Sequence, residues 1–301
     1  MFNDEADNLE KARYYKSDHL IKPIAAYERG QDRCLVFPWA TGGNLSKYWE
    51  TQQSDATEKD GVYWILSQFV GLCSALEELH ENNCRHGDLK PENILWFREL
   101  DDGVRTGTLQ IADLNLTTFH EKEAYTKERR QRGIFTNTPS GTFRYEPPEM
   151  DSTRGYEQVR SRGYDIWSMG CILLELLVWL VYGYDFLTRF QDITRCFWLK
   201  QRGDDGKPSY VVADYVSGVM DTMASRLAEQ PHQGQLYLDL LDIIQNRLLV
   251  VECSEVYESS PDKREIARVL HKLIRQIYER CSAVPNYLTP VRLDEILLPF
   301  A

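Results

Sequence analysis

The sequence contains no Cys-x-x-Cys pair, although seven cysteines are spread over its 301 residues. An odd number of scattered thiols does not match a disulfide framework, and their spacing does not match a structural zinc site. Several lie in apolar surroundings, as in Leu-Cys73-Ser and Gly-Cys171-Ile. The pattern favours reduced, buried thiols and an intracellular location, in the cytoplasm or the nucleus.

Positive charge is also scarce, because 35 Lys and Arg face 46 Asp and Glu, for a net charge of -11 at pH 7. This balance argues against a general nucleic-acid-binding surface. The first residues, Met-Phe-Asn-Asp-Glu-Ala-Asp, are acidic and polar, so they match neither a signal peptide nor a transit peptide. Apolar residues make up 43% of the chain, which is enough for a sizeable core.

One long apolar run, from Ile166 to Tyr184, has the length to cross a membrane. It carries Glu175 near its centre, where a charge is costly in lipid, and it has no basic flanking residues. A helix that is apolar on all sides also fits the centre of a large domain. We therefore expect a buried helix and no membrane interaction.

Apolar periodicity predicts a small β-containing N-terminal part followed by a mainly helical part. Gly30 marks the turn of a predicted hairpin, and Asp101 to Gly103 mark a second turn. The predicted segments are a helix at 1–18, strands at 24–27 and 34–37, an amphipathic helix at 63–79, strands at 94–97 and 108–112, a polar irregular stretch at 117–140, helices from 165 to about 280, and an extended tail at 282–301.

The strongest chemical pattern is the run from His86 to Asn93, His-Gly-Asp-Leu-Lys-Pro-Glu-Asn, between the amphipathic helix and a strand. Phosphoryl transfer needs a carboxylate that orients the attacking hydroxyl, a cation on the migrating phosphate and oxygen ligands for Mg²⁺. Asp88, Lys90 and Asn93 supply one of each within six residues. The run therefore suits phosphoryl transfer.

A second carboxylate, Asp113, directly follows the strand at 108–112. A strand–turn–strand arrangement can bring Asp113 beside Asn93, and carboxylate and amide oxygens suit Mg²⁺. The alternative is a surface hairpin in which these Asp and Asn residues are ordinary turn residues. The occurrence of both patterns in this order favours the metal site.

Together these segments resemble the catalytic domain of eukaryotic-type Ser/Thr protein kinases. The run from His86 is similar to the catalytic loop, and Asp113-Leu114-Asn115 to the metal-binding Asp-Phe-Gly segment. The stretch 141–149, Gly-Thr-Phe-Arg-Tyr-Glu-Pro-Pro-Glu, is similar to the substrate-docking segment, which in the family ends in Ala-Pro-Glu. Asp165-Ile-Trp-Ser-Met-Gly is similar to the start of the central large-lobe helix. The resemblance covers roughly residues 1–277.

The resemblance implies an α+β, protein-kinase-like two-lobe fold. Residues 1–40 would be the remnant of an incomplete small lobe with a short β-hairpin, 41–280 a mainly α-helical large lobe, and 281–301 a C-terminal tail. The implied reaction transfers the γ-phosphoryl group of ATP, with Mg²⁺, to Ser or Thr hydroxyls of protein substrates. The lysine two residues after Asp88 marks the Ser/Thr type. The oligomeric state is left open.

The resemblance also assigns individual residues. Thr142 would hydrogen-bond Asp88 and Lys90, and Arg264 would pair with Glu149. His86, Leu114 and Leu9 would form a column anchored by Asp165. The implied nucleotide contacts are the gatekeeper Phe37, the backbone of Pro38 and Ala40, the pocket floor of Leu45 and Leu95, and Glu5, which pairs with the small-lobe lysine in the family.

Three departures accompany the resemblance. No Gly-x-Gly-x-x-Gly occurs and no strand lysine precedes Glu5, so we expect an N-terminally truncated kinase whose phosphates lack a cover. Gly87 stands where an arginine is usual, and Asn115 stands where a glycine is usual.

Two alternatives remain open. The first is a truncated or pseudokinase interaction module without catalysis, which the missing lysine and glycine loop favour. The second is a small-molecule phosphotransferase of the aminoglycoside or choline kinase type, which shares the His-Gly-Asp pattern. The segment at 141–149 argues against the second, because a protein-docking surface is a protein kinase feature.

Overall fold

The computed structural model describes most of the chain, namely residues 15–30, 32–101, 104–113, 118–119, 141–152, 162–203, 206, 208–230, 233–251 and 264–294. Residues 1–14 of the predicted N-terminal helix, with Glu5 and Leu9, lie outside the described residues, as do the stretch 120–140, Leu114, Asn115 and the side chain of Thr142. Residues 15–18, which end the predicted helix, are not helical.

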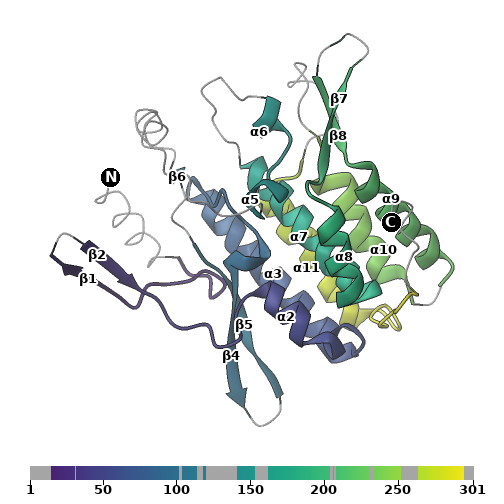
Figure 1. The fold of residues 1–301 in the computed structure, drawn as a ribbon. Helices are drawn as coiled ribbons and strands as arrows, with labels where there is room; N and C mark the ends of the chain where they lie inside the picture. Colours follow the sequence, from purple (N-terminus) through teal and green to yellow (C-terminus); the bar gives the residue numbers. More distant parts are fainter. Residues whose placement is uncertain are drawn as a thin grey trace.

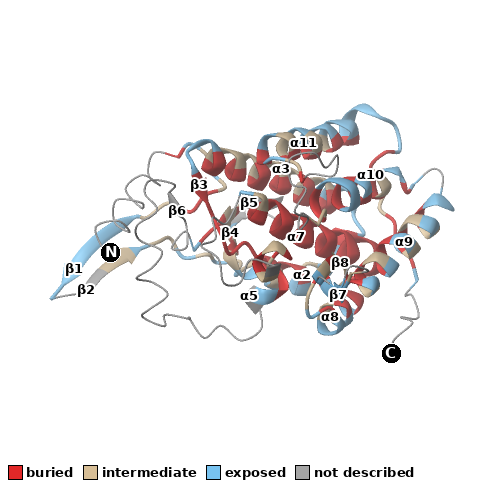
Figure 2. Ribbon diagram, turned by 90° about the horizontal axis from the view of Figure 1, so that it is seen from above, coloured by how far each residue is buried: buried red, intermediate tan, exposed pale blue. Residues whose placement is uncertain are grey.

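The predicted N-terminal hairpin is confirmed. Strand β1 (Ala25–Arg29) pairs antiparallel with β2 (Asp32–Val36), and Gly30 at the turn has a φ of 65°. A glycine adopts such a left-handed conformation without the steric cost that a Cβ brings. The hairpin extends away from the helical body (Figures 1 and 2), and all five residues of β1 are exposed.

The second predicted hairpin is also confirmed, and its strands are about twice as long as the apolar runs suggest. Strand β4 (Ile94–Asp101) pairs with β5 (Val104–Ile111) in a register that sets Ile94 opposite Ile111. The strands extend beyond the predicted limits because backbone pairing continues through polar residues toward the turn.

Residues 19–21 are hydrogen-bonded to strand β5 of the hairpin β4–β5. Leu20 forms a parallel bridge with Ile111, and the Ile21 amide donates to the Ile111 carbonyl at 2.9 Å. The His19 ring bonds the Leu109 carbonyl through Nδ1 at 2.7 Å. Its other side lies against Gly71, where an added Cβ would come within 2.0 Å of Nε2. The imidazole therefore occupies a site between the strand and a helix.

Two helices connect the hairpin β1–β2 to the catalytic run. Helix α2 (Leu45–Thr51) begins after Asn44, whose side chain accepts a hydrogen bond from the Lys47 amide at 3.0 Å, as an N-cap residue does. Helix α3 (Lys59–Glu81) confirms the amphipathic prediction at 63–79 and packs against α11 (Ala267–Ala283). A short 3-10 helix, η1 (Gln53–Ala56), lies between α2 and α3.

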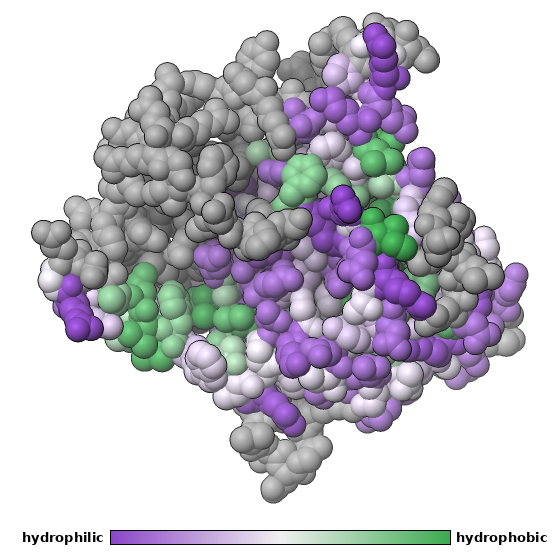
Figure 3. All heavy atoms as spheres, viewed as in Figure 1, coloured by the Kyte–Doolittle hydropathy of each residue, from purple (hydrophilic) through white to green (hydrophobic). Residues whose placement is uncertain are grey.

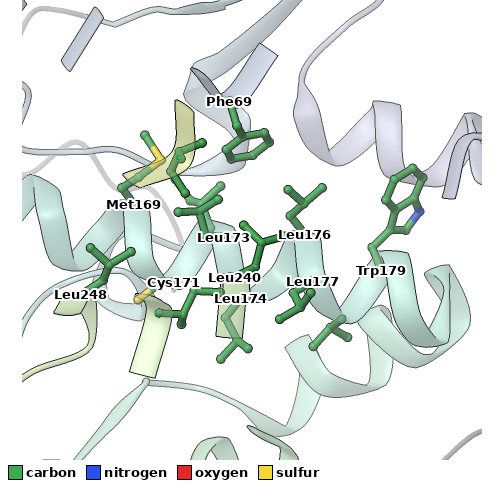
Figure 4. Packing of buried hydrophobic residues seen from close by; sticks show 14 of the residues in the cluster. Phe69, Met169, Cys171, Leu173, Leu174, Leu176, Leu177, Trp179, Leu240 and Leu248 are labelled. Carbon is green, nitrogen blue, oxygen red and sulfur yellow. The ribbon is translucent and has the colours of Figure 1, made fainter. Parts of the chain in front are cut away.

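Helix α7 (Gly163–Tyr182) is the centre of the helical part, and every residue from Tyr164 to Tyr182 is buried. By length and composition it could span a membrane, but its apolar window lies wholly inside the protein. The prediction of a buried central helix is therefore confirmed. Figure 4 shows the apolar packing along it, with Phe69 from α3 and Leu240 from α10 beside residues of α7.

The prediction of helices from 165 to about 280 is wrong at 198–212, where two strands form instead. Strands β7 (Trp198–Arg202) and β8 (Pro208–Val212) form an antiparallel hairpin there. Gly206 in its turn has a φ of 80°, and Pro208 lacks the amide that a helix interior needs. Among the described residues after α7, the helices are α8 (Tyr184–Ile193), α9 (Asp214–Ala228), α10 (Gln235–Ile243), the π-helix η4 (Ile244–Leu248) and α11.

The tail that follows α11 has no regular secondary structure up to residue 294, and it packs on the helical part. The Val291 amide donates to the Tyr237 hydroxyl at 3.1 Å, and the Leu293 amide to the Val181 carbonyl at 2.9 Å. On the face seen in Figure 3, hydrophilic residues cover most of the helical part, and hydrophobic ones surface in small groups. The α+β class with a mainly helical large part is confirmed; the domain limits at 40 and 280 stay predictions.

The half-buried His19 makes stability pH-dependent. Burial lowers its pKa below the ordinary 6.5, and it outweighs the opposing effects of the Leu109 hydrogen bond and the Asp18 charge. The unfolded chain then binds more protons as the pH falls through 6.5, so the stability present above this pH is lost below it. Comparing urea unfolding at about pH 7.5 and about pH 5.5, we expect His19→Gln to lose less stability than the wild type on acidification. Equal losses would contradict this assignment.

Candidate active site

The hairpin β4–β5 brings the two chemical patterns together. The catalytic run ends in the 3-10 helix η2 (Pro91–Asn93), directly before β4, and Asp113 comes two residues after β5. Since Ile94 pairs with Ile111, the Ala112 amide donates to the Asn93 carbonyl at 2.8 Å. Asp113 therefore follows a residue that is hydrogen-bonded to Asn93.

Asp88, Lys90 and Asn93 form one polar cluster. Lys90 Nζ lies 2.8 Å from Asp88 Oδ2, and both side chains are buried, so the ion pair is shielded from water. Asn93 Nδ2 donates to the Asp88 carbonyl oxygen at 2.8 Å and to Asp88 Oδ2 at 3.3 Å. Because the amide nitrogen is used in this way, Asn93 Oδ1 is the atom of this side chain that suits a cation.

His86 joins this cluster to the segment that carries Asp113. Its Nδ1 accepts a hydrogen bond from the Asp88 amide at 3.2 Å, so Nε2 carries the proton and donates to the Ala112 carbonyl at 2.8 Å. The ring is fully buried. The His86 ring thus connects the Asp88 amide to Ala112, the residue before Asp113.

Asp165, in the first turn of α7, is hydrogen-bonded to the backbone of the catalytic run. Its carboxylate accepts hydrogen bonds from the His86 amide at 2.9 Å, the Gly87 amide at 2.8 Å and His80 Nε2 at 2.9 Å. Burial alone raises the pKa of Asp165, but the hydrogen bond and charge of His80 and the hydrogen bond from the Gly87 amide lower it overall. The carboxylate therefore stays ionised inside the protein.

Two backbone positions in the site have positive φ. Gly87 has a φ of 80° and Asp113 a φ of 61°. Glycine tolerates this conformation at no steric cost, so Gly87 suits its place in the chain. At Asp113 the conformation carries strain, which is found most often at functional sites.

Three of the residues proposed to contact nucleotide lie where the N-terminal hairpin leads into α2. Phe37, Pro38 and Ala40 are half-buried, and the Ala40 carbonyl accepts from the Gly43 amide at 3.2 Å. Leu95, on β4, is half-buried, whereas Leu45 is fully buried in the core.

The backbone of 42–44 pairs with β4, because the Gly42 amide donates to the Trp96 carbonyl at 3.0 Å and the Trp96 amide to the Gly43 carbonyl at 2.8 Å. An added Cβ at Gly42 would come within 2.4 Å of the Trp96 ring, so only glycine fits here. This pairing fixes the 37–45 segment beside the strand that carries Leu95.

The segment at 141–149 begins with the short helix α5 (Gly141–Arg144) and leads into α6 (Glu149–Ser152). Arg264 forms a bidentate pair with the Glu149 carboxylate, with Nη2 at 2.7 Å from Oε2, as the resemblance implied. The guanidinium also donates to the Val250 carbonyl at 2.7 Å and lies 4.8 Å from the centre of the Trp167 ring. The predicted ion pair is confirmed.

Two residues that sequence reasoning missed also organise the site. They are His80, near the end of α3, and Arg144, the last residue of α5, and the sequence pattern assigned no role to either side chain. Arg144 is buried, and its Nε and Nη2 donate to Glu175 Oε1 at 3.0 and 2.8 Å. The signal for this pair was Glu175, a charge at the centre of an apolar helix that requires a buried partner.

The donor set at the end of the hairpin fits Mg²⁺. Among the residues that the structure describes, no group of three or more His, Cys, Asp or Glu gathers as a metal cluster. Mg²⁺ takes few protein ligands and completes its shell with water and phosphate oxygens. An amide oxygen from Asn93 and a carboxylate from Asp113 match that requirement.

The chain is similar to known kinases. A model of the protein kinase domain matches residues 2–224, which is well over half of the chain. A probable myosin light chain kinase of Dictyostelium discoideum is 29% identical over 218 residues, covering 71% of this chain and 38% of that protein.

Two further relatives are the serine/threonine-protein kinase nekl-2 of Caenorhabditis elegans and the calcium/calmodulin-dependent protein kinase cmkA of Emericella nidulans. The first is 32% identical over 147 residues, covering 48% of this chain and 36% of that protein. The second is 30% identical over 178 residues, covering 59% and 37%. In each case the chain spans less than two thirds of the relative's own length.

Replacing the carboxylate that anchors the catalytic run tests its role. In Asp165→Asn one of the two carboxylate oxygens becomes an NH₂ group. This NH₂ group faces an N–H donor whose hydrogen bond the carboxylate oxygen accepted, so at least one buried donor loses its hydrogen bond. We expect a loss of about 3 kcal/mol in the free energy of unfolding, measured by chemical denaturation. The control Asp185→Asn, which changes an exposed residue of α8, should alter stability by about 0.5 kcal/mol or less. Similar effects in both variants would refute the anchoring role.

Proposed function

Because this chain belongs to the protein kinase family, whose domain model matches residues 2–224, we propose that it transfers the γ-phosphoryl group of ATP to Ser or Thr hydroxyls of protein substrates. The observation that carries the proposal is the buried Asp88–Lys90 pair with Asn93, whose carbonyl is hydrogen-bonded to the residue before Asp113. A purely structural segment has no need to bury a lysine and an aspartate together, because desolvating two charges is costly.

Each residue has a distinct role in the proposed reaction. Asp88 orients the attacking hydroxyl and accepts its proton, and Lys90 neutralises charge on the migrating phosphate. Asn93 and Asp113 would hold Mg²⁺, which supplies charge neutralisation on the phosphates when bound. His86 and Asp165 keep this geometry through hydrogen bonds to the backbone around Asp88. Thr142 and Glu5 stay predictions from the resemblance.

The segment at 37–40 supports nucleotide recognition by the backbone. Pro38 has a carbonyl acceptor and no N–H, whereas Ala40 adds an N–H donor two residues later. Adenine presents an amino donor next to a ring acceptor, so this pair of groups complements one edge of the base. Phe37, Leu45 and Leu95 would provide the apolar surroundings that a nucleotide base requires.

The substrate class follows the names of the relatives, several of which are serine/threonine kinases. We propose protein substrates and an intracellular location, which the free thiols among the described residues support. The acidic balance and the burial of α7 support a chain that binds neither nucleic acid nor membrane.

Nucleotide binding is tested first by thermal unfolding of the 301-residue chain with Mg²⁺ and ATP. A ligand that binds the folded state stabilises it by about 2.7 kcal/mol at a concentration of 100 Kd. We expect a stabilising shift in the wild type and none in Asp113→Asn, because the variant loses a carboxylate ligand for Mg²⁺. Asp185→Asn should keep the full shift. A full shift in Asp113→Asn would refute the metal assignment, and no shift in the wild type at millimolar ATP would refute the kinase activity of this chain.

Catalysis is tested by following γ-phosphoryl transfer from labelled ATP to a degenerate Ser/Thr peptide library. Asp88→Asn should lower kcat by roughly a hundredfold to ten-thousandfold, as loss of a positioned base does, with ATP binding retained. Wild-type transfer that Asp88→Asn leaves unchanged would contradict the role of Asp88. Nucleotide binding without any transfer would favour the interaction module.

A further inference from the structure

The segment at 141–149 and the rest of α6, together residues 141–152, are called the docking segment below. The hairpin β7–β8 lies against it, in a stretch where the sequence predicted helix (Figure 1). Trp198, the first residue of β7, donates its indole N–H to the Glu146 carbonyl at 2.8 Å. Its ring also packs edge-on against Phe143, with centroids 5.8 Å apart. One side chain of the hairpin thus contacts two residues of the docking segment.

A second set of contacts joins the hairpin to α6. Asp151 Oδ2 accepts from Lys200 Nζ of β7 at 3.0 Å and from the Tyr210 hydroxyl of β8 at 3.0 Å. The Tyr210 ring lies edge-on to Trp198 at 5.5 Å, so the two strands hold their contact groups together. Both strands therefore share one carboxylate of the docking segment.

Arg144 is hydrogen-bonded to the end of α8, a few residues before the hairpin. Its guanidinium donates to the Gln191 carbonyl at 2.7 Å and to the Thr194 carbonyl at the end of α8. The same group lies 5.1 Å from the centre of the Phe197 ring and pairs with Glu175 of α7. Carbonyl oxygens at a helix C-terminus attract a cation.

A buried guanidinium is costly to displace, because its hydrogen bonds and its ion pair would all be lost together. Arg144 therefore fixes the end of α5 against α7 and α8, and the hairpin fixes the residues that follow. Phe143 remains 41% exposed between these two attachments, so its position is set while its surface stays accessible.

We propose that Arg144 and the hairpin β7–β8, through Trp198 and Tyr210, are positioning elements that hold the docking segment in the conformation that binds the protein substrate. This inference rests on the proposed kinase function, because the docking segment is where the substrate peptide would bind. It assigns a role in substrate binding to a hairpin that lies outside the catalytic cluster.

The test measures KM for a Ser/Thr peptide, KM for ATP and kcat in three single variants of the 301-residue chain. Tyr210→Phe removes only the hydroxyl on Asp151, Trp198→Phe removes the indole N–H, and Arg144→Lys keeps the charge without the forked donors. The matched control is Tyr287→Phe, because the Tyr287 hydroxyl makes a similar hydrogen bond to Asp239 at 2.6 Å in the tail.

We expect peptide KM to rise by about tenfold in the three variants, with ATP KM unchanged, because a displaced docking segment affects only the peptide. Tyr287→Phe should leave peptide KM at the wild-type value. A general loss of folding would lower kcat and stability without this separation of the two KM values. Unchanged peptide KM in all three variants would overturn the positioning role and leave the kinase function standing.

Hydrogen exchange of the amides at 143–151 gives a readout that needs no activity. We expect faster exchange there in the three variants than in Tyr287→Phe, with α3 and α11 unchanged. If the wild type transfers no phosphate, the proposed function fails, and the exchange rates still decide whether the hairpin positions this segment. Equal exchange in all variants would overturn the inference.

Discussion

The arrangement of the site depends on the hydrogen bonds that the buried Asp165 carboxylate accepts. The donors are the His80 ring and the backbone amides of His86 and Gly87. Asp165 lies in the first turn of α7, whose residues from Tyr164 to Tyr182 are all buried. A charge inside a protein is tolerated only when its hydrogen bonds are satisfied, so the chain before Asp88 has little freedom to move. Asp165 thus transfers the rigidity of the core helix to the residues proposed to perform the reaction.

Helix α7 carries a second buried carboxylate that plays a similar part for the docking segment. Glu175 accepts from Arg144 and, at 2.9 Å, from the Tyr145 hydroxyl. Burial raises the pKa of Glu175, although the Arg144 charge and the hydrogen bonds from Tyr145 and Arg144 act in the opposite direction. The two carboxylates lie ten positions apart on one helix, so the catalytic run and the docking segment are held by a common rigid element. Because α7 is apolar and buried, water does not compete for the hydrogen bonds that Asp165 and Glu175 accept.

Local patterns predicted the elements whose contacts lie close in the sequence. The hairpin at 24–39, the helix at 63–79 and the hairpin around residues 94–112 were all found from periodicity and turn residues. The hairpin β7–β8 was missed because it lies within a long helical region and has a strongly polar first strand, with a glycine and a proline as its main signals. Its stability comes from Trp198 and Tyr210 packing on the docking segment, which lies about fifty residues earlier in the chain.

The sequence alone determined the fold class, the order of the chemical segments and the identity of Asp88, Lys90, Asn93 and Asp113 as the candidate site, because these depend on residue types and short spacings. It also indicated that the apolar helix around Glu175 is buried inside the protein, since a charge at that position is costly in lipid. Only the tertiary structure decided that Glu175 pairs with Arg144, that His80 joins the anchor at Asp165, and that β7–β8 holds the docking segment. These pairings bring together residues far apart in the chain, and local propensity carries no information about which distant groups meet in the core.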